Sequence, residues 1–93
     1  MTPRSPVPQE VSAELQRVVR RWQQLPLDRA LAWAPSVRSL LDDLAGPRGP
    51  VPDLGPAVLM DQLTVLVYDV CEAGGGATAD LTSRLADLRR ELA

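Results

Sequence analysis

Residues 55–74, GPAVLMDQLTVLVYDVCEAG, form the most apolar stretch of the chain and decide its fold class. Gly55 and Pro56 at its start and Gly74 at its end are typical of helix ends, because proline suits the first helical turn and glycine the left-handed residue after the last. A short apolar run could also form a buried strand. Wound at about 100° per residue, however, one side of the stretch becomes a continuous apolar line, which favours a helix over about 56–73. The line consists of Leu59, Leu63, Leu66 and Val70.

The opposite side of this predicted helix mixes apolar and acidic side chains. Its members, spaced three and four residues apart, are Val58, Asp61, Val65, Tyr68 and Glu72. A tyrosine among polar neighbours suits an interface better than a core, because its hydroxyl needs a partner. We therefore expect Val58, Val65 and Tyr68 to bind a partner, unless another segment of this chain covers them.

Three further helices are predicted, at about 9–24, 28–45 and 79–92, and each has apolar residues at helical spacing. We expect a break or a kink in the second near Pro35, because an interior proline removes one backbone hydrogen bond and costs about 3 kcal/mol. The apolar residues are Val11, Leu15, Val18, Val19 and Trp22 in the first; Trp33, Val37, Leu40, Leu41 and Leu44 in the second; and Leu81, Leu85, Leu88 and Leu92 in the last. Both tryptophans are interpreted as core residues.

The connections are rich in proline and glycine. Residues 1–8 form a proline-rich arm, residues 74–77 a flexible joint, and residues 46–55, GPRGPVPDLG, a semi-rigid connection that we call the strap. We expect the strap to cross one end of the molecule with Val51 and Leu54 tucked in.

The sequence therefore predicts an all-α fold, a small four-helix up-and-down bundle formed by a single domain over residues 1–93. A three-helix core, with the last helix packed on a partner, would use the same apolar stripes.

Composition gives further limits. The 93 residues carry a net charge of −2, one cysteine, and neither histidine nor lysine. With no secretion signal and no apolar run of membrane length, we expect a cytoplasmic chain with no membrane partner. The single cysteine, Cys71, cannot form an internal disulfide, and its place on the apolar side predicts a buried thiol.

Catalysis lacks its usual side chains. Without histidine and lysine, the commonest general base, the commonest metal ligand and the Schiff-base nucleophile are missing. Asp61 and Asp69 are about 12 Å apart along the helix and cannot act on one bond. We therefore expect no catalytic residue, no metal and no cofactor, with Asp61, Asp69 and Glu72 solvated or paired with arginine. Candidate partners are Arg17, Arg21 and Arg38.

Arginines gather on two helices. Arg17, Arg20 and Arg21 lie on the first, and a second group on the last consists of Arg84, Arg89 and Arg90. If the two groups adjoin, they could bind phosphate or an acidic partner, so Arg17, Arg20 and Arg21 are candidate anion-binding residues.

Three functions remain open. We favour a small non-catalytic helical module that binds proteins, as a homodimer or as the regulatory partner of another protein. The alternatives are a nucleic-acid-associated regulator that uses the arginines, and a bundle that binds a small ligand near Asp61 or Asp69. Twelve acidic residues and the lack of a basic tail or base-reading helix count against nucleic acid.

Overall fold

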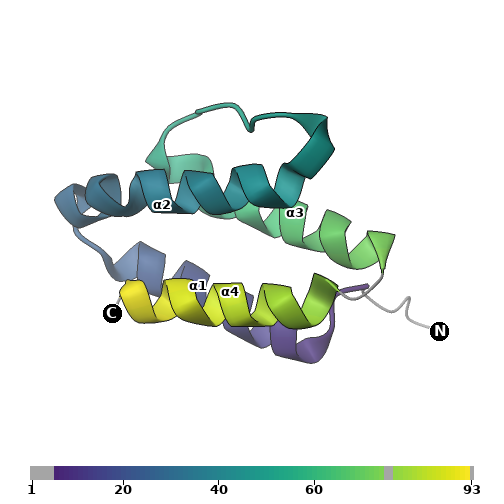
Figure 1. Cartoon of the computed structure of the whole chain (residues 1–93). Coiled ribbons are helices and arrows are strands. Elements are labelled where there is room, and N and C mark those ends of the chain that lie inside the picture. Colours follow the sequence, from purple (N-terminus) through teal and green to yellow (C-terminus); the bar gives the residue numbers. More distant parts are fainter. Residues whose placement is uncertain (1–5, 75–76, 93) are drawn as a thin grey trace.

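Four α-helices make up the protein in a computed structural model that describes residues 6–74 and 77–92 (Figure 1). In chain order, the elements are α1 (Gln9–Gln24), α2 (Leu27–Ala45), the 3₁₀ turns η1 (Gly46–Arg48) and η2 (Pro56–Val58), α3 (Leu59–Ala73) and α4 (Ala77–Glu91). These ranges contain no strand, and the all-α bundle predicted from the sequence is confirmed. Residues 1–5 of the expected arm and residues 75–76 of the expected joint lie outside the described residues.

Prolines determine where the first two helices begin. Pro8 and Pro26 occupy the N-cap positions of α1 and α2, each with φ of −59° and an extended ψ near 153°. Leu25, the residue before Pro26, is also extended, with ψ of 137°. Because proline pushes its preceding residue out of the helical region, α1 ends at Gln24, as the sequence predicts.

The break expected near Pro35 is wrong, since α2 continues through that residue from Leu27 to Ala45. The backbone group that loses its donor is the carbonyl of Leu31, four residues earlier. Leu31 and Pro35 are both exposed, so water can bond to this carbonyl. The other side of the helix stays buried through Ala34 and Val37, so the helix packs against the core on both sides of Pro35.

The first and last helices lie side by side and run in the same direction. Arg21 Nε donates a 2.9 Å hydrogen bond to the carbonyl oxygen of Leu92 near the C-terminal ends of both helices. Farther back along the pair, Arg89 Nε lies 2.9 Å from Glu14 Oε2. Figure 1 shows the pair in the lower layer, with the C-terminal end of α4 beside that of α1.

The second and third helices also run in the same direction, because the strap returns along the molecule between them (Figure 1). Asp42 Oδ1 accepts a 2.9 Å hydrogen bond from the amide of Val51, and Arg38 lies 3.3 Å from Asp53. The strap therefore runs antiparallel to α2. The helices joined by the first and third connections, α1 with α2 and α3 with α4, are antiparallel, as in an up-and-down bundle. The strap differs from the prediction, because it runs back along the length of the bundle rather than across one end.

The core lies where the apolar stripes of the four helices meet. Its fully buried side chains are Val11, Val18, Val37, Leu41, Leu59, Leu63, Val67, Leu81, Leu85 and Leu92. Trp22 is buried and Trp33 packs against the core, as expected. Because the leucines of α4 belong to this core, the last helix packs within its own chain. No helix in the described ranges is both long and apolar enough to cross a membrane.

Candidate functional site

A mainly apolar groove of about 520 Å³ lies between the strap and the outer side of α3. The strap contributes Val51, Pro52 and Leu54, and the other wall includes Val58 and Val65. Three charged side chains also line it, namely Arg48, Asp61 and Asp69. The groove thus contains two of the three residues that the sequence predicts to bind a partner.

Two polar contacts hold the strap to α3. Gln62 Nε2 donates a 3.0 Å hydrogen bond to the carbonyl of Pro52, and Arg48 lies 3.1 Å from Asp69. The two α3 residues are seven positions apart, about 10 Å along the helix, and Val65 lies between them. The strap is therefore fastened above and below Val65 without covering it.

Several apolar side chains around the groove remain open to solvent. Val65 is 59% exposed and Tyr68 45%, whereas Val58 is half-buried. Leu54, which we expected to be tucked in, is 65% exposed. The strap thus shelters one end of the mixed side of α3 and leaves the middle open. Tyr68 does not line the groove, but it lies one turn from Val65 on the same helix.

The acidic residues of α3 differ in their partners. Asp69 pairs with Arg48 of the strap and with none of the three arginines suggested by the sequence. Asp61 and Glu72 are exposed, and neither forms an ion pair within the described part of the chain. The two free carboxylates lie on the same side of α3 as Val65 and Tyr68, so this surface is apolar with a negative border.

A second hollow, of about 330 Å³, is lined by arginines from both members of the α1–α4 pair. Its residues are Arg17, Arg20, Arg21, Gln24 and Arg89. The structure thus brings the three predicted anion-binding residues together and adds Arg89 to them.

The other arginines of α4 do not join this hollow. Arg84 lies 2.9 Å from Asp43 of α2, and Arg90 pairs with Asp87 on its own helix. At about 100° per residue, Arg84 and Arg89 flank the leucine line on opposite sides and Arg90 points away from it. The three arginines of α4 therefore point in three different directions and do not form the single cluster that the sequence suggested.

Glu14 is the carboxylate closest to the arginine hollow. It lies 3.0 Å from Arg17 and 2.9 Å from Arg89. The hydrogen bond donated by Arg89 is the main reason that the pKa of Glu14 is lowered from its ordinary value; partial burial opposes this effect. Arg20 has no hydrogen-bond or ion-pair partner within residues 6–74 and 77–92.

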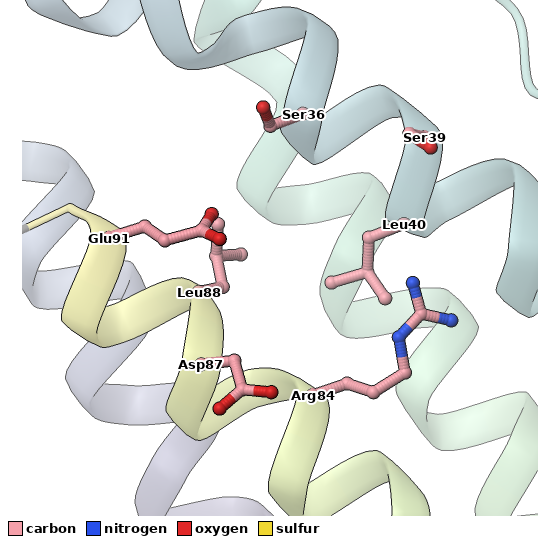
Figure 2. A pocket seen from close by; sticks show the side chains of 7 residues that line it. All are labelled: Ser36, Ser39, Leu40, Arg84, Asp87, Leu88 and Glu91. Atoms are coloured by element: carbon pink, nitrogen blue, oxygen red, sulfur yellow. The ribbon is translucent and has the colours of Figure 1, made fainter.

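A third cleft, of about 350 Å³, separates α2 from α4. Figure 2 shows Ser36 and Ser39 on the α2 side, with Leu88 and Glu91 directed toward them from α4. A serine nucleophile needs a neighbouring base with a pKa suited to proton transfer. Asp87 and Glu91 also line the cleft, but neither serine forms a side-chain hydrogen bond with them among the described residues.

Cys71 is buried, as the sequence predicts. Burial raises the pKa of its thiol, which favours the protonated and unreactive form. Within the described residues, no three side chains of the histidine, cysteine, aspartate and glutamate types gather where they could hold a metal ion.

The chain matches no protein-family model, and no curated protein or solved structure gives a significant match.

Proposed function

We propose that this protein is a non-catalytic interaction module that binds another protein through the groove between the strap and α3. The observation that carries the proposal is the open apolar surface formed by Leu54, Val65 and Tyr68 around an apolar groove. Apolar surface of this kind, bordered by polar residues, is typical of sites that another chain covers.

The charges on α3 favour a different protein over a second copy of this chain. A parallel two-fold arrangement would place Asp61 against Asp61. An antiparallel one that sets Val65 opposite Tyr68 would place Asp61 against Glu72. Both carboxylates lack a partner in the described residues, so either homodimer brings like charges together, which is destabilising.

The partner that fits this surface is an amphipathic helix with apolar residues on one side and lysine or arginine beside them. The α3 wall of the groove runs from Val58 to Asp69, about 16 Å, which matches about three turns of a partner helix. Its apolar side chains would cover Val65 and Leu54, and its cations would meet Asp61 and Glu72.

Two synthetic helical peptides with the same apolar side test this proposal, one flanked by lysine and the other by glutamate. Backbone amide shifts of the labelled protein are followed during titration. We expect the lysine peptide to bind and to shift residues around Val65, Tyr68 and Leu54, and the glutamate peptide to bind at least tenfold more weakly. Tyr68→Glu and Asp61→Arg should each weaken binding of the lysine peptide.

Leu31→Ser provides a matched control, because Leu31 is an exposed leucine on α2 that does not line the groove. It should leave the titration unchanged. Failure of both peptides to shift the groove residues would overturn the proposal. Sedimentation supplies the other decisive result: a dimer at tens of micromolar that Tyr68→Glu dissociates would make the occupant a second copy.

A further inference from the structure

The arginines of this protein are paired with acids in two different ways. Outside the arginine hollow, four arginines each have an aspartate of their own, and Arg29 is exposed with no ion-pair partner in the described residues. These pairs are Arg38 with Asp53, Arg48 with Asp69, Arg84 with Asp43, and Arg90 with Asp87. Inside the hollow, Arg17 and Arg89 share the single carboxylate of Glu14, whereas Arg20 and Arg21 form no ion pair in the described residues. Counting the residues that the structure describes, the hollow has four arginines and one contacting carboxylate, an excess of three positive charges on a chain whose net charge is −2.

A structural role explains part of this cluster. Cations near the C-terminal ends of helices are stabilising, and Arg21 bonds the carbonyl of Leu92 in just this way. Arg17 and Arg89 are held by Glu14. Arg20 is exposed and bonds no group in the described residues, so its donors are free beside three like charges. Four guanidinium groups around one carboxylate repel one another, and a bound anion would relieve that repulsion.

The hollow still has many free donors. Each guanidinium has five N–H groups in a planar fork suited to phosphate oxygens. Arg21 and Arg89 use their Nε atoms in the bonds described above, and Arg17 uses Nη1. Gln24 adds an amide on the same wall.

We propose that this hollow binds a phosphate dianion, either inorganic phosphate or the phosphate group of a small ester. A compact anion fits better than a nucleic-acid backbone, because a duplex needs positive charge spread along a surface. On α4 that spread is missing, since Arg84 and Arg90 are neutralised by their own aspartates. The site is separate from the strap–α3 groove, so neither proposal depends on the other.

Titration with inorganic phosphate at pH 8 and low salt, followed by backbone amide shifts of the full chain, tests the site. We expect saturable shifts at the C-terminal ends of α1 and α4. Arg20→Gln and Arg89→Gln should each weaken binding at least tenfold. Arg90→Gln is the matched control, because it removes the neighbouring arginine outside the hollow and should leave the dissociation constant unchanged.

Glu14→Gln gives a result that a purely structural role would not produce. Removing the carboxylate that competes for Arg17 and Arg89 should tighten phosphate binding about threefold to tenfold. Lack of saturation at 10 mM phosphate (about ten times a millimolar dissociation constant), or equal weakening by Arg90→Gln, would overturn the proposal. A labelled duplex forms the second arm: if it binds while phosphate and a nucleoside monophosphate do not, the ligand is a nucleic-acid backbone and the small-anion assignment is wrong.

Discussion

The α1–α4 pair and the α2–α3 pair both consist of helices that run in the same direction, but they are joined in different ways. In the first pair, polar bonds pass directly between helices, from Arg21 to Leu92 and from Arg89 to Glu14. In the second, the polar bonds among the described residues go from each helix to the strap, as from Asp42 to Val51 and from Gln62 to Pro52.

This difference determines where each pair is open. Between α1 and α4, where the helices bond directly, lies the charged hollow of about 330 Å³. The strap lies outside α2 and α3, and its prolines leave few amides that could bond to either helix. A connection attached at only a few points leaves apolar surface beside it uncovered, and the groove with Val65 and Leu54 is that surface.

The largest contrast is expected between a core residue of the closed pair and an exposed residue of the open pair. Leu85 on α4 is fully buried, so Leu85→Ala should lower the free energy of unfolding by about 2–5 kcal/mol. Val65→Ala should change it by less than about 0.5 kcal/mol, because Val65 is mostly exposed. Urea denaturation measures both values. Equal losses would mean that Val65 is buried in solution and that the groove is closed.

Pro35→Ala should stabilise the protein by about 1–2 kcal/mol. The variant restores an amide donor for the carbonyl of Leu31, and this gain exceeds the added entropy of the unfolded chain. Thermal unfolding should show a midpoint several degrees higher. Pro26→Ala, at the N-cap of α2, is the control and should give no such gain, since the backbone amide at that position has no helical acceptor. An unchanged midpoint for Pro35→Ala would show that hydrogen bonds from water already satisfy the Leu31 carbonyl.

The fall in the free energy of unfolding at acid pH tests the direct bonds of the α1–α4 pair. The folded-state pKa of Glu14 is lowered, so its contribution is present above the unfolded pKa of about 4.3 and is lost as the pH falls through the folded value. Glu14→Gln should remove about 1 kcal/mol at pH 7 and flatten the decline below pH ~4.5. Urea midpoints between pH 3 and pH 7 measure the effect.

Glu10→Gln is the control for this series, since Glu10 is an exposed carboxylate one turn earlier on α1. It should leave the fall at acid pH close to that of the unmodified protein. An equal flattening by both variants would assign the acid sensitivity to net charge rather than to the bonds of Glu14.

The smallest effect is expected at the strap. Asp42→Ala removes the acceptor of the Val51 amide, so hydrogen exchange at Val51 should become at least tenfold faster while global stability changes by less than about 1 kcal/mol. Asp43→Ala is the matched neighbour, because Asp43 pairs with Arg84 on α4 and does not contact the strap amide. Accelerated exchange in both variants would mean that the strap responds to α2 as a whole.

The helices follow from local signals in the sequence, whereas their arrangement depends on distant contacts. Pro8, Pro26 and Gly74 fix helix ends through backbone geometry that acts over one or two residues, and the sequence therefore predicts α1 correctly. The cost of Pro35 depends on whether the carbonyl of Leu31 faces water, which only the packing of α2 determines. The strap is long enough to cross the bundle end or to return along it, so its length does not fix the direction of α3.

The site residues show the same limit. Val65 and Tyr68 are found from their helical positions, but Leu54 lies in the strap, where no periodicity predicts which side chains are buried. Arg89 could have been separated from Arg84 and Arg90 by their angles around the leucine line of α4. That it joins Arg17, Arg20 and Arg21 depends on the parallel pairing of α1 with α4, which no local signal gives.

The pairing of α1 with α4 also has a consequence for the order in which the chain can fold. Arg21 and Leu92 are 71 residues apart in sequence, and Glu14 and Arg89 are 75 apart. The apolar stripe of α1 cannot be covered by α4 until residues 77–91 have left the ribosome. Closing so long a loop costs entropy before any contact repays it, so this bundle should fold more slowly than one whose neighbouring helices are adjacent in sequence. During synthesis, α1 is the helix that must wait longest for its main partner.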